Sequence, residues 1–152
     1  RVEELAGKSS NYIPLPYVVK GMDFSFSGLM TASKEALKDR KNRIEDVCHS
    51  FQETAFAMLV EVTERALAHT GKNEVLLCGG VGANRRLQEM LGIMCQARGA
   101  KFYVPDKKFL MDNGAMIAYT GLLMLKCGMT TSLEGSRVKP NYRPDEVEVR
   151  WI

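Results

Sequence analysis

The sequence predicts an α/β fold, and three consecutive segments carry that prediction. Residues 75–78 form a short apolar run, the pattern of a strand buried on both faces. A glycine turn over 79–82 and an amphipathic helix that ends at Gly99 follow it, and residues 101–104 have the pattern of a second strand. A strand, a helix and a strand in this order form a βαβ unit, so we expect the two strands to be parallel.

Length and composition place the chain among soluble globular domains. It has 152 residues, enough for one domain with its own core, and 45% of them are hydrophobic and 26% charged. No apolar run approaches the roughly 18 residues of a membrane helix, so we expect no membrane partner. The chain opens on Arg1 without an initiator Met, which indicates a fragment or a processed product.

The four cysteines lie far apart in apolar patterns, and no Cys-x-x-Cys pair occurs. We expect reduced, buried thiols in a protein of the cytoplasm or the nucleus, and no zinc site built from these residues. The cysteines are Cys48, Cys78, Cys95 and Cys127.

The N-terminal part alternates short helices with extended chain. Residues 1–8 predict a short helix, and the prolines in 12–19 favour an extended segment. Apolar and polar residues alternate over 22–26, the pattern of a strand with one apolar face. Ser27 is then placed to cap a helix over about 29–38.

The longest predicted element is a helix over residues 44–66 that Gly71 ends. Asn42 and Glu45 have the spacing of a capping box at its start.

The C-terminal part begins with a loop over 106–111. A helix follows that opens at 112–118, ends at Gly128 and is apolar nearly all round, so we expect it to be buried. Apolar and charged residues alternate over 145–151, the pattern of an exposed edge strand.

The candidate site lies where the two predicted parallel strands end. Ligands bind beyond the carboxyl ends of such strands, and both Gly79-Gly80 and Asp112 follow a strand there. Backbone amides beside a carboxylate suit a phosphate with a divalent metal. The alternatives stay open: a plain βα turn, a capping role for Asp112, and for Asn84 either a cap or a ligand contact.

Two basic clusters could contact RNA phosphates or could simply be solvated surface. They are Lys34, Lys38, Arg40, Lys41 and Arg43, and Arg137, Lys139 and Arg143. The net charge of +3 does not decide between these alternatives.

Four segments, 20–29, 78–84, 111–118 and 145–151, together resemble the tRNA threonylcarbamoyladenosine transferase family, also named O-sialoglycoprotein endopeptidase. The resemblance implies an actin-like, hexokinase-type ATPase fold with two ribonuclease-H-like lobes. Residues 1–152 are similar to the C-terminal lobe, so the N-terminal lobe is absent from this chain.

The resemblance also implies an activity and its partners. The family is an acyltransferase that moves a threonylcarbamoyl group from its adenylate to the tRNA adenosine beside the anticodon. It uses one divalent metal ion, for which iron or zinc is expected, and ATP or threonylcarbamoyl-adenylate as ligand. Its archaeal and eukaryotic members are catalytic subunits of the KEOPS complex, which contains a small atypical kinase.

By position in the motifs, Asp112 matches the family's metal-binding aspartate. Asn84 matches a nucleotide-contacting asparagine, Gly79-Gly80 a turn beside the phosphate, and Glu3 a glutamate that contacts the nucleoside. No general base could be placed, so the catalytic residues stay unknown.

The family's His-x-x-x-His metal pair belongs to the other lobe, and this sequence lacks it. We therefore expect that the chain alone neither holds metal tightly nor transfers the group. Two alternatives remain: a non-catalytic docking lobe for KEOPS subunits, and a metallopeptidase, which the lack of a His-Glu-x-x-His signature disfavours.

Overall fold

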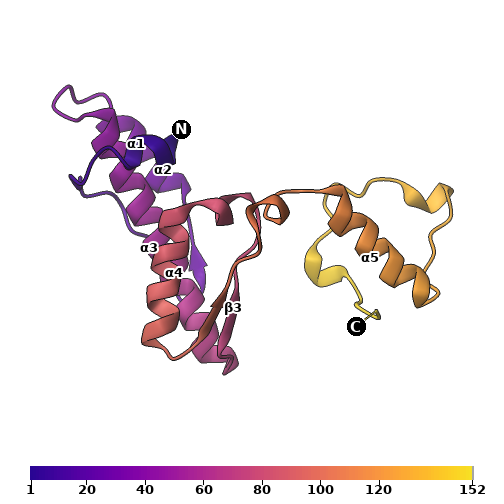
Figure 1. Ribbon diagram of the computed structural model, residues 1–152. Helices are drawn as coiled ribbons and strands as arrows, with labels where there is room; N and C mark the ends of the chain where they lie inside the picture. The colour runs from indigo at the N-terminus through magenta and orange to yellow at the C-terminus, as the bar shows by residue number, and fades with distance from the viewer. Residues whose placement is uncertain (152) are drawn as a thin grey trace.

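A long central helix, α3 (Ile44–Thr70), organises the fold. In the computed structural model, which describes residues 1–151, three helices pack on it (Figure 1). They are α1 (Val2–Ala6), α2 (Ser27–Ala36) and α4 (Arg85–Ala97). The helix α3 ends at Gly71, whose φ of 63° is left-handed, as the sequence predicts.

The core joins α2, α3 and α4. Its buried members are Leu29, Ala55, Phe56, Met58, Leu67, Leu87, Leu91, Met94 and Cys95. Apolar residues at helical spacing therefore bring three helices to one cluster, which is where most of the burial energy arises.

The predicted βαβ unit is confirmed. Strand β3 (Glu74–Leu76) pairs in parallel with β4 (Lys101–Tyr103), and α4 connects them. Strands β1 (Val19–Lys20) and β2 (Asp23–Phe24) form a separate antiparallel pair across the turn at Gly21. The fold class is thus α/β.

The expectation that residues 75–78 are buried on both faces is wrong. Successive strand residues point to opposite faces, so Val75 and Phe102 pack on the helical core while Leu76 and Tyr103 lie on the other face. Leu76 is 63% exposed and Tyr103 47%. No helix or strand of residues 1–151 covers that outer face.

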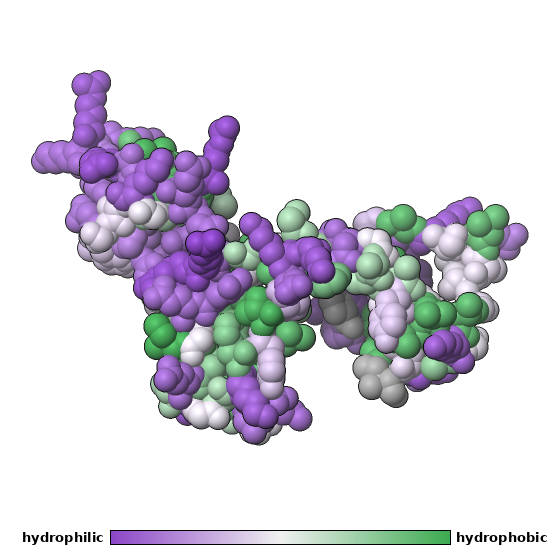
Figure 2. All heavy atoms as spheres, in the orientation of Figure 1, coloured by the Kyte–Doolittle hydropathy of each residue, from purple (hydrophilic) through white to green (hydrophobic). Residues whose placement is uncertain are grey.

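The helix α5 (Gly114–Lys126) forms as predicted, but the expectation that it is buried is wrong. It stands apart from α1 to α4 in Figure 1, and none of its residues is buried. Figure 2 shows hydrophobic residues at the surface of this part of the molecule. The exposed large hydrophobic side chains of α5 are Met116, Ile117, Tyr119, Leu122 and Leu125. An all-apolar helix needs a partner on every side, and residues 1–151 leave every residue of α5 at least partly exposed.

The predicted edge strand over 145–151 is also wrong. The tail contains two short 3₁₀ turns, η3 (Glu134–Ser136) and η4 (Pro144–Glu146), and residues 147–151 pair with no strand. An alternating pattern forms a strand only where a neighbouring strand takes its backbone hydrogen bonds.

Two predicted helix caps differ from the structure. Ser27 is the first residue of α2 and Phe26 its N-cap, while Arg43 rather than Asn42 occupies the N-cap position of α3, without a side-chain hydrogen bond. The Asn42 side chain instead donates to the Ala36 carbonyl at 2.9 Å, closing the end of α2. An Asn side chain can hydrogen-bond to the backbone of either neighbouring helix. The capping-box spacing therefore predicts the wrong partner for Asn42.

The expectation that all four cysteines are buried is wrong as well. Cys95 is buried and Cys48 half-buried, but Cys78 and Cys127 are exposed, and all four are free thiols. Both exposed thiols belong to the surfaces that lack a covering element.

Among residues 1–151, no helix is both long enough and apolar enough to cross a bilayer.

A matched pair of substitutions tests the one-sided sheet. Val75→Ala should lower the free energy of unfolding of the chain by about 1–2 kcal/mol, because Val75 packs on the core. Leu76→Ala should change it by less than about 0.5 kcal/mol, because Leu76 already faces solvent. Denaturant unfolding measures both values, and equal losses would show that the outer face is covered.

Candidate functional site

The glycine turn after β3 has a backbone that only glycine adopts readily. Gly79 has φ 92° and ψ 162°, and it precedes a 3₁₀ turn, η1 (Gly80–Ala83). Gly82 is buried: a Cβ there would lie 3.2 Å from Leu77 and 3.6 Å from Leu110. The turn is therefore fixed both by backbone conformation and by close packing.

The amides at the start of this turn are available to a ligand. No hydrogen bond among residues 1–151 uses the N–H groups of Gly79, Gly80 or Val81. Nothing lies within 4 Å of a Cβ built at Gly79 or Gly80, so their backbones can be approached closely. Amides of this kind are suited to binding an anion.

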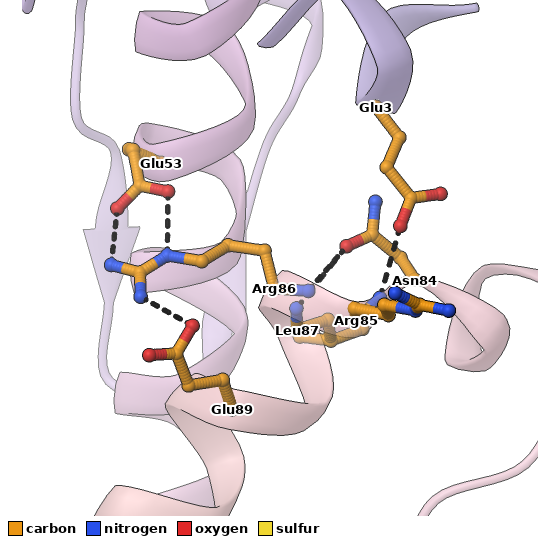
Figure 3. A network of polar contacts seen from close by, with 7 residues as sticks. All are labelled: Glu3, Glu53, Asn84, Arg85, Arg86, Leu87 and Glu89. Carbon is orange, nitrogen blue, oxygen red and sulfur yellow. Dashed lines mark hydrogen bonds and ion pairs between the residues drawn. The ribbon is translucent and has the colours of Figure 1, made fainter. Parts of the chain in front are cut away.

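Asn84 confirms the expectation of a helix cap. Its Oδ1 accepts hydrogen bonds from the amides of Arg86 at 2.9 Å and Leu87 at 3.3 Å, in the first turn of α4 (Figure 3). Its Nδ2 donates to Oε1 of Gln52 on α3 at 3.0 Å. The side chain thus has only one donor hydrogen left for a ligand.

Glu3 reaches the same helix end from α1. Its Oε1 accepts the amide hydrogen of Arg85 at 3.1 Å (Figure 3). The next amides of α4, from Arg86 to Gln88, are bonded to Asn84. The first four amides of α4 are therefore all satisfied by the protein, so a phosphate could bind them only by displacing Glu3 or Asn84.

Arg86 ties this helix end to α3. Its guanidinium binds Glu53 with two hydrogen bonds of 2.8 and 2.7 Å, and Glu89 with one of 2.9 Å (Figure 3). The hydrogen bonds from Arg86 hold the pKa of Glu53 below its ordinary value, and those to Glu53 raise the pKa of Arg86. Residues 84, 85 and 86 are thus each bonded to α1 or α3.

A cavity of about 350 Å³ lies beside this network. Its lining includes Glu3, Gln52, Glu53, Arg85 and Arg86. The cavity carries both acidic and basic groups, which suits a polar ligand better than an apolar one.

Asp112 is exposed and is not the cap of α5, so that alternative is wrong. Asn113 takes the capping role, with Oδ1 accepting from the amide of Met116 at 2.9 Å. Asp112 lies two residues after Leu110, which packs against Gly82 of the glycine turn. The loop that carries the carboxylate, with η2 (Lys107–Phe109) in it, therefore adjoins the turn.

The described residues offer a metal one ligand rather than a site. The carboxylate of Asp112 is the type of oxygen ligand that divalent cations accept. Residues 1–151 contain no group of three or more His, Cys, Asp or Glu side chains that could hold a metal ion. Within the described residues, Asp112 therefore belongs to no cluster of three or more such ligands.

Four side chains of the network were missed from the sequence: Gln52, Glu53, Arg86 and Glu89. Gln52 left a usable signal, because a polar side chain amid the apolar face of a long helix is expected to have a specific partner. The pair of Glu53 and Arg86 is separated by 33 positions, and no spacing rule links residues so far apart.

The glycine turn supplies a matched pair of variants. Gly79→Ala should lower the free energy of unfolding by about 1–3 kcal/mol, because alanine is strained at φ 92° and ψ 162°. Gly80→Ala has open space and an ordinary φ, so it should unfold like the unaltered protein. Denaturant titration compares them, and an unchanged Gly79→Ala would contradict the turn geometry.

The low pKa of Glu53 predicts a pH effect. The stability due to its pairing with Arg86 is fully present above the ordinary pKa of 4.5 and is lost as the pH falls through the lower value of the folded state. Arg86→Gln should lower the free energy of unfolding at neutral pH by about 1 kcal/mol and flatten its decline below pH 4.5.

The control for that experiment is Lys38→Gln, which breaks only the exposed pair with Glu35. It should leave the acid profile unchanged. An equally steep acid decline in Arg86→Gln would contradict the role of the Glu53 pair.

Comparison with known proteins assigns the family. A family model described as tRNA N6-adenosine threonylcarbamoyltransferase matches residues 1–119. Over 152 residues the chain is 69% identical to a protein of that name from Methanococcoides burtonii, and it covers 45% of that protein. It is 70% identical to a probable bifunctional tRNA threonylcarbamoyladenosine biosynthesis protein from Methanosarcina acetivorans and covers 27% of it.

The chain therefore spans less than half the length of these relatives. Matches of this identity over all of its residues leave no ambiguity about descent. The chain belongs to the tRNA N6-adenosine threonylcarbamoyltransferase family.

Proposed function

We propose that this chain is the C-terminal lobe of an enzyme that transfers a threonylcarbamoyl group from its adenylate to the tRNA adenosine beside the anticodon. The observation that carries the proposal is family membership combined with a turn whose free amides adjoin the loop of Asp112. The βαβ unit is compatible with a ribonuclease-H-like lobe of an actin-like ATPase fold.

In this proposal the amides of the Gly79-Gly80 turn bind the phosphate of ATP or of the adenylate. They stabilise negative charge there without reorganising, because the turn is already fixed by Gly82 and Leu110. Glu3, at the rim of the polar cavity, accepts hydrogen bonds from nucleoside hydroxyls through its second carboxylate oxygen.

Asn84 has two roles in this proposal. It caps α4, and its one remaining donor hydrogen can reach the nucleotide. Substitution of Asn84 should therefore weaken nucleotide binding mainly by loosening the start of α4.

Asp112 is proposed as one ligand of a divalent metal, iron or zinc, completed by residues of an N-terminal lobe. Such an ion would supply Lewis-acid polarisation to the reacting group. The contribution of this chain is to hold one carboxylate next to the phosphate-binding turn.

The uncovered surfaces support a proposal about the partners. The outer face of β3 and β4 and the whole of α5 expose apolar side chains that a covering polypeptide would bury. We propose the N-terminal lobe as that polypeptide, and KEOPS subunits, including a small atypical kinase, as further partners. The same surfaces favour the second candidate function, a docking lobe without catalysis.

Asp112→Asn in the full-length gene product should abolish tRNA modification, because among residues 1–151 the first turn of α5 carries no acidic side chain that could take its place. The measurement is threonylcarbamoyladenosine formed on tRNA from the adenylate. Glu134→Gln, an exposed carboxylate in η3, is the control and should retain activity. Normal turnover by Asp112→Asn would refute the metal role and leave the docking function.

The 152 residues alone should form no modified tRNA, because residues 1–151 contain no group of three or more side chains that could hold a metal ion. Adding a separately purified N-terminal half should restore activity. Modification by the isolated chain would overturn the division into two lobes.

A further inference from the structure

A second cavity, of about 310 Å³, lies at the carboxyl edge of the parallel sheet. Arg85 and Gln88 line it from α4, and Pro105 and Lys107 line it from the segment after β4. Gln88 Nε2 donates to the Gly82 carbonyl at 2.7 Å, so one wall of this cavity is fixed to the glycine turn.

The charge of this cavity is purely positive. Among residues 1–151, Arg85 and Lys107 are the only charged residues that line it, and both are exposed. In the part of the chain that the structure describes, neither forms a salt bridge. The larger cavity, by contrast, carries Glu3, Glu53 and Glu89. Two cations that form no salt bridge, in a cavity that no carboxylate of residues 1–151 lines, attract an anion.

The geometry points to a backbone phosphate of the tRNA as that anion, an inference that rests on the proposed function. The groups assigned to the nucleotide, Gly79, Gly80, Glu3 and Asp112, do not line this cavity. Arg85 lines both cavities, so an anion held here lies directly beside the nucleotide.

A phosphate contact in this cavity would position the tRNA. Contacts to phosphates fix the register and orientation of a nucleic acid without reading its sequence. The planar guanidinium of an arginine and the ammonium group of a nearby lysine can both donate hydrogen bonds to the oxygens of one phosphate. Arg85 and Lys107 would thus position the strand that carries the target adenosine relative to the glycine turn.

The test uses the full-length gene product and an unmodified tRNA transcript. Lys107→Gln should weaken tRNA binding about threefold to tenfold at low salt and reduce the slope of log affinity against log salt by about 1. Arg85→Gln should act in the same way, because only its side chain changes and the amide bonded to Glu3 stays.

The matched control is Lys72→Gln. Lys72 is exposed at the amino edge of the sheet, beside a cavity of about 230 Å³ that also contains Arg98. Its removal should leave both the affinity for tRNA and the salt slope unchanged. Thermal melts verify that all three variants fold.

ATP binding, measured on the same variants, separates the two sources of phosphate. Affinity for ATP should stay unchanged in Lys107→Gln. An unchanged tRNA affinity in Lys107→Gln, an equal loss of tRNA affinity in Lys72→Gln, or a parallel loss of ATP affinity in Lys107→Gln would each overturn the inference.

If the unaltered protein modifies tRNA while Lys107→Gln binds it normally, this inference fails and the proposed function stands. If the unaltered protein does not modify tRNA, the proposed function fails, and if it does not bind tRNA, both fail.

Discussion

The start of α4 is held by the protein's own side chains, and the position of the candidate site depends on those bonds. Asn84 caps the helix, Glu3 takes the amide of Arg85, and Arg86 is paired with Glu53 on α3. These bonds stabilise the helix start, and they also occupy the place where an anion commonly binds after a glycine turn. The amides that stay available belong to the turn itself, one step earlier in the chain. The proposed phosphate position therefore lies at the turn rather than at the helix.

Local patterns predicted the scaffold of this site well. The apolar run at β3, the glycine turn, the cap at Asn84 and the second strand are all encoded within about 30 consecutive residues, where periodicity and turn chemistry act directly. The tertiary bonds of that scaffold could not be predicted in the same way. Glu3, Glu53 and Arg86 come from separate elements, and only the packing of α1 and α4 on α3 brings them together.

Burial was the weakest part of the sequence prediction, for a physical reason. Leu76 and the side chains of α5 have the composition of a core, but they are exposed, because no helix or strand of residues 1–151 covers them. The composition of a segment shows that its side chains are apolar, but it does not show whether other residues of the same chain bury them. The relatives are more than twice as long as this chain, which agrees with the proposal that a second lobe buries these faces and completes the ligand set around Asp112.

Amide hydrogen exchange of the full-length gene product, with and without ATP, tests the claim about the phosphate most directly. The amides of Arg85, Arg86 and Leu87 should be protected without ligand, because Glu3 and Asn84 already bind them. ATP should newly protect Gly79, Gly80 and Val81. Rapid exchange at residues 85–87 that ATP suppresses, with residues 79–81 unaffected, would contradict this and place the phosphate on the helix.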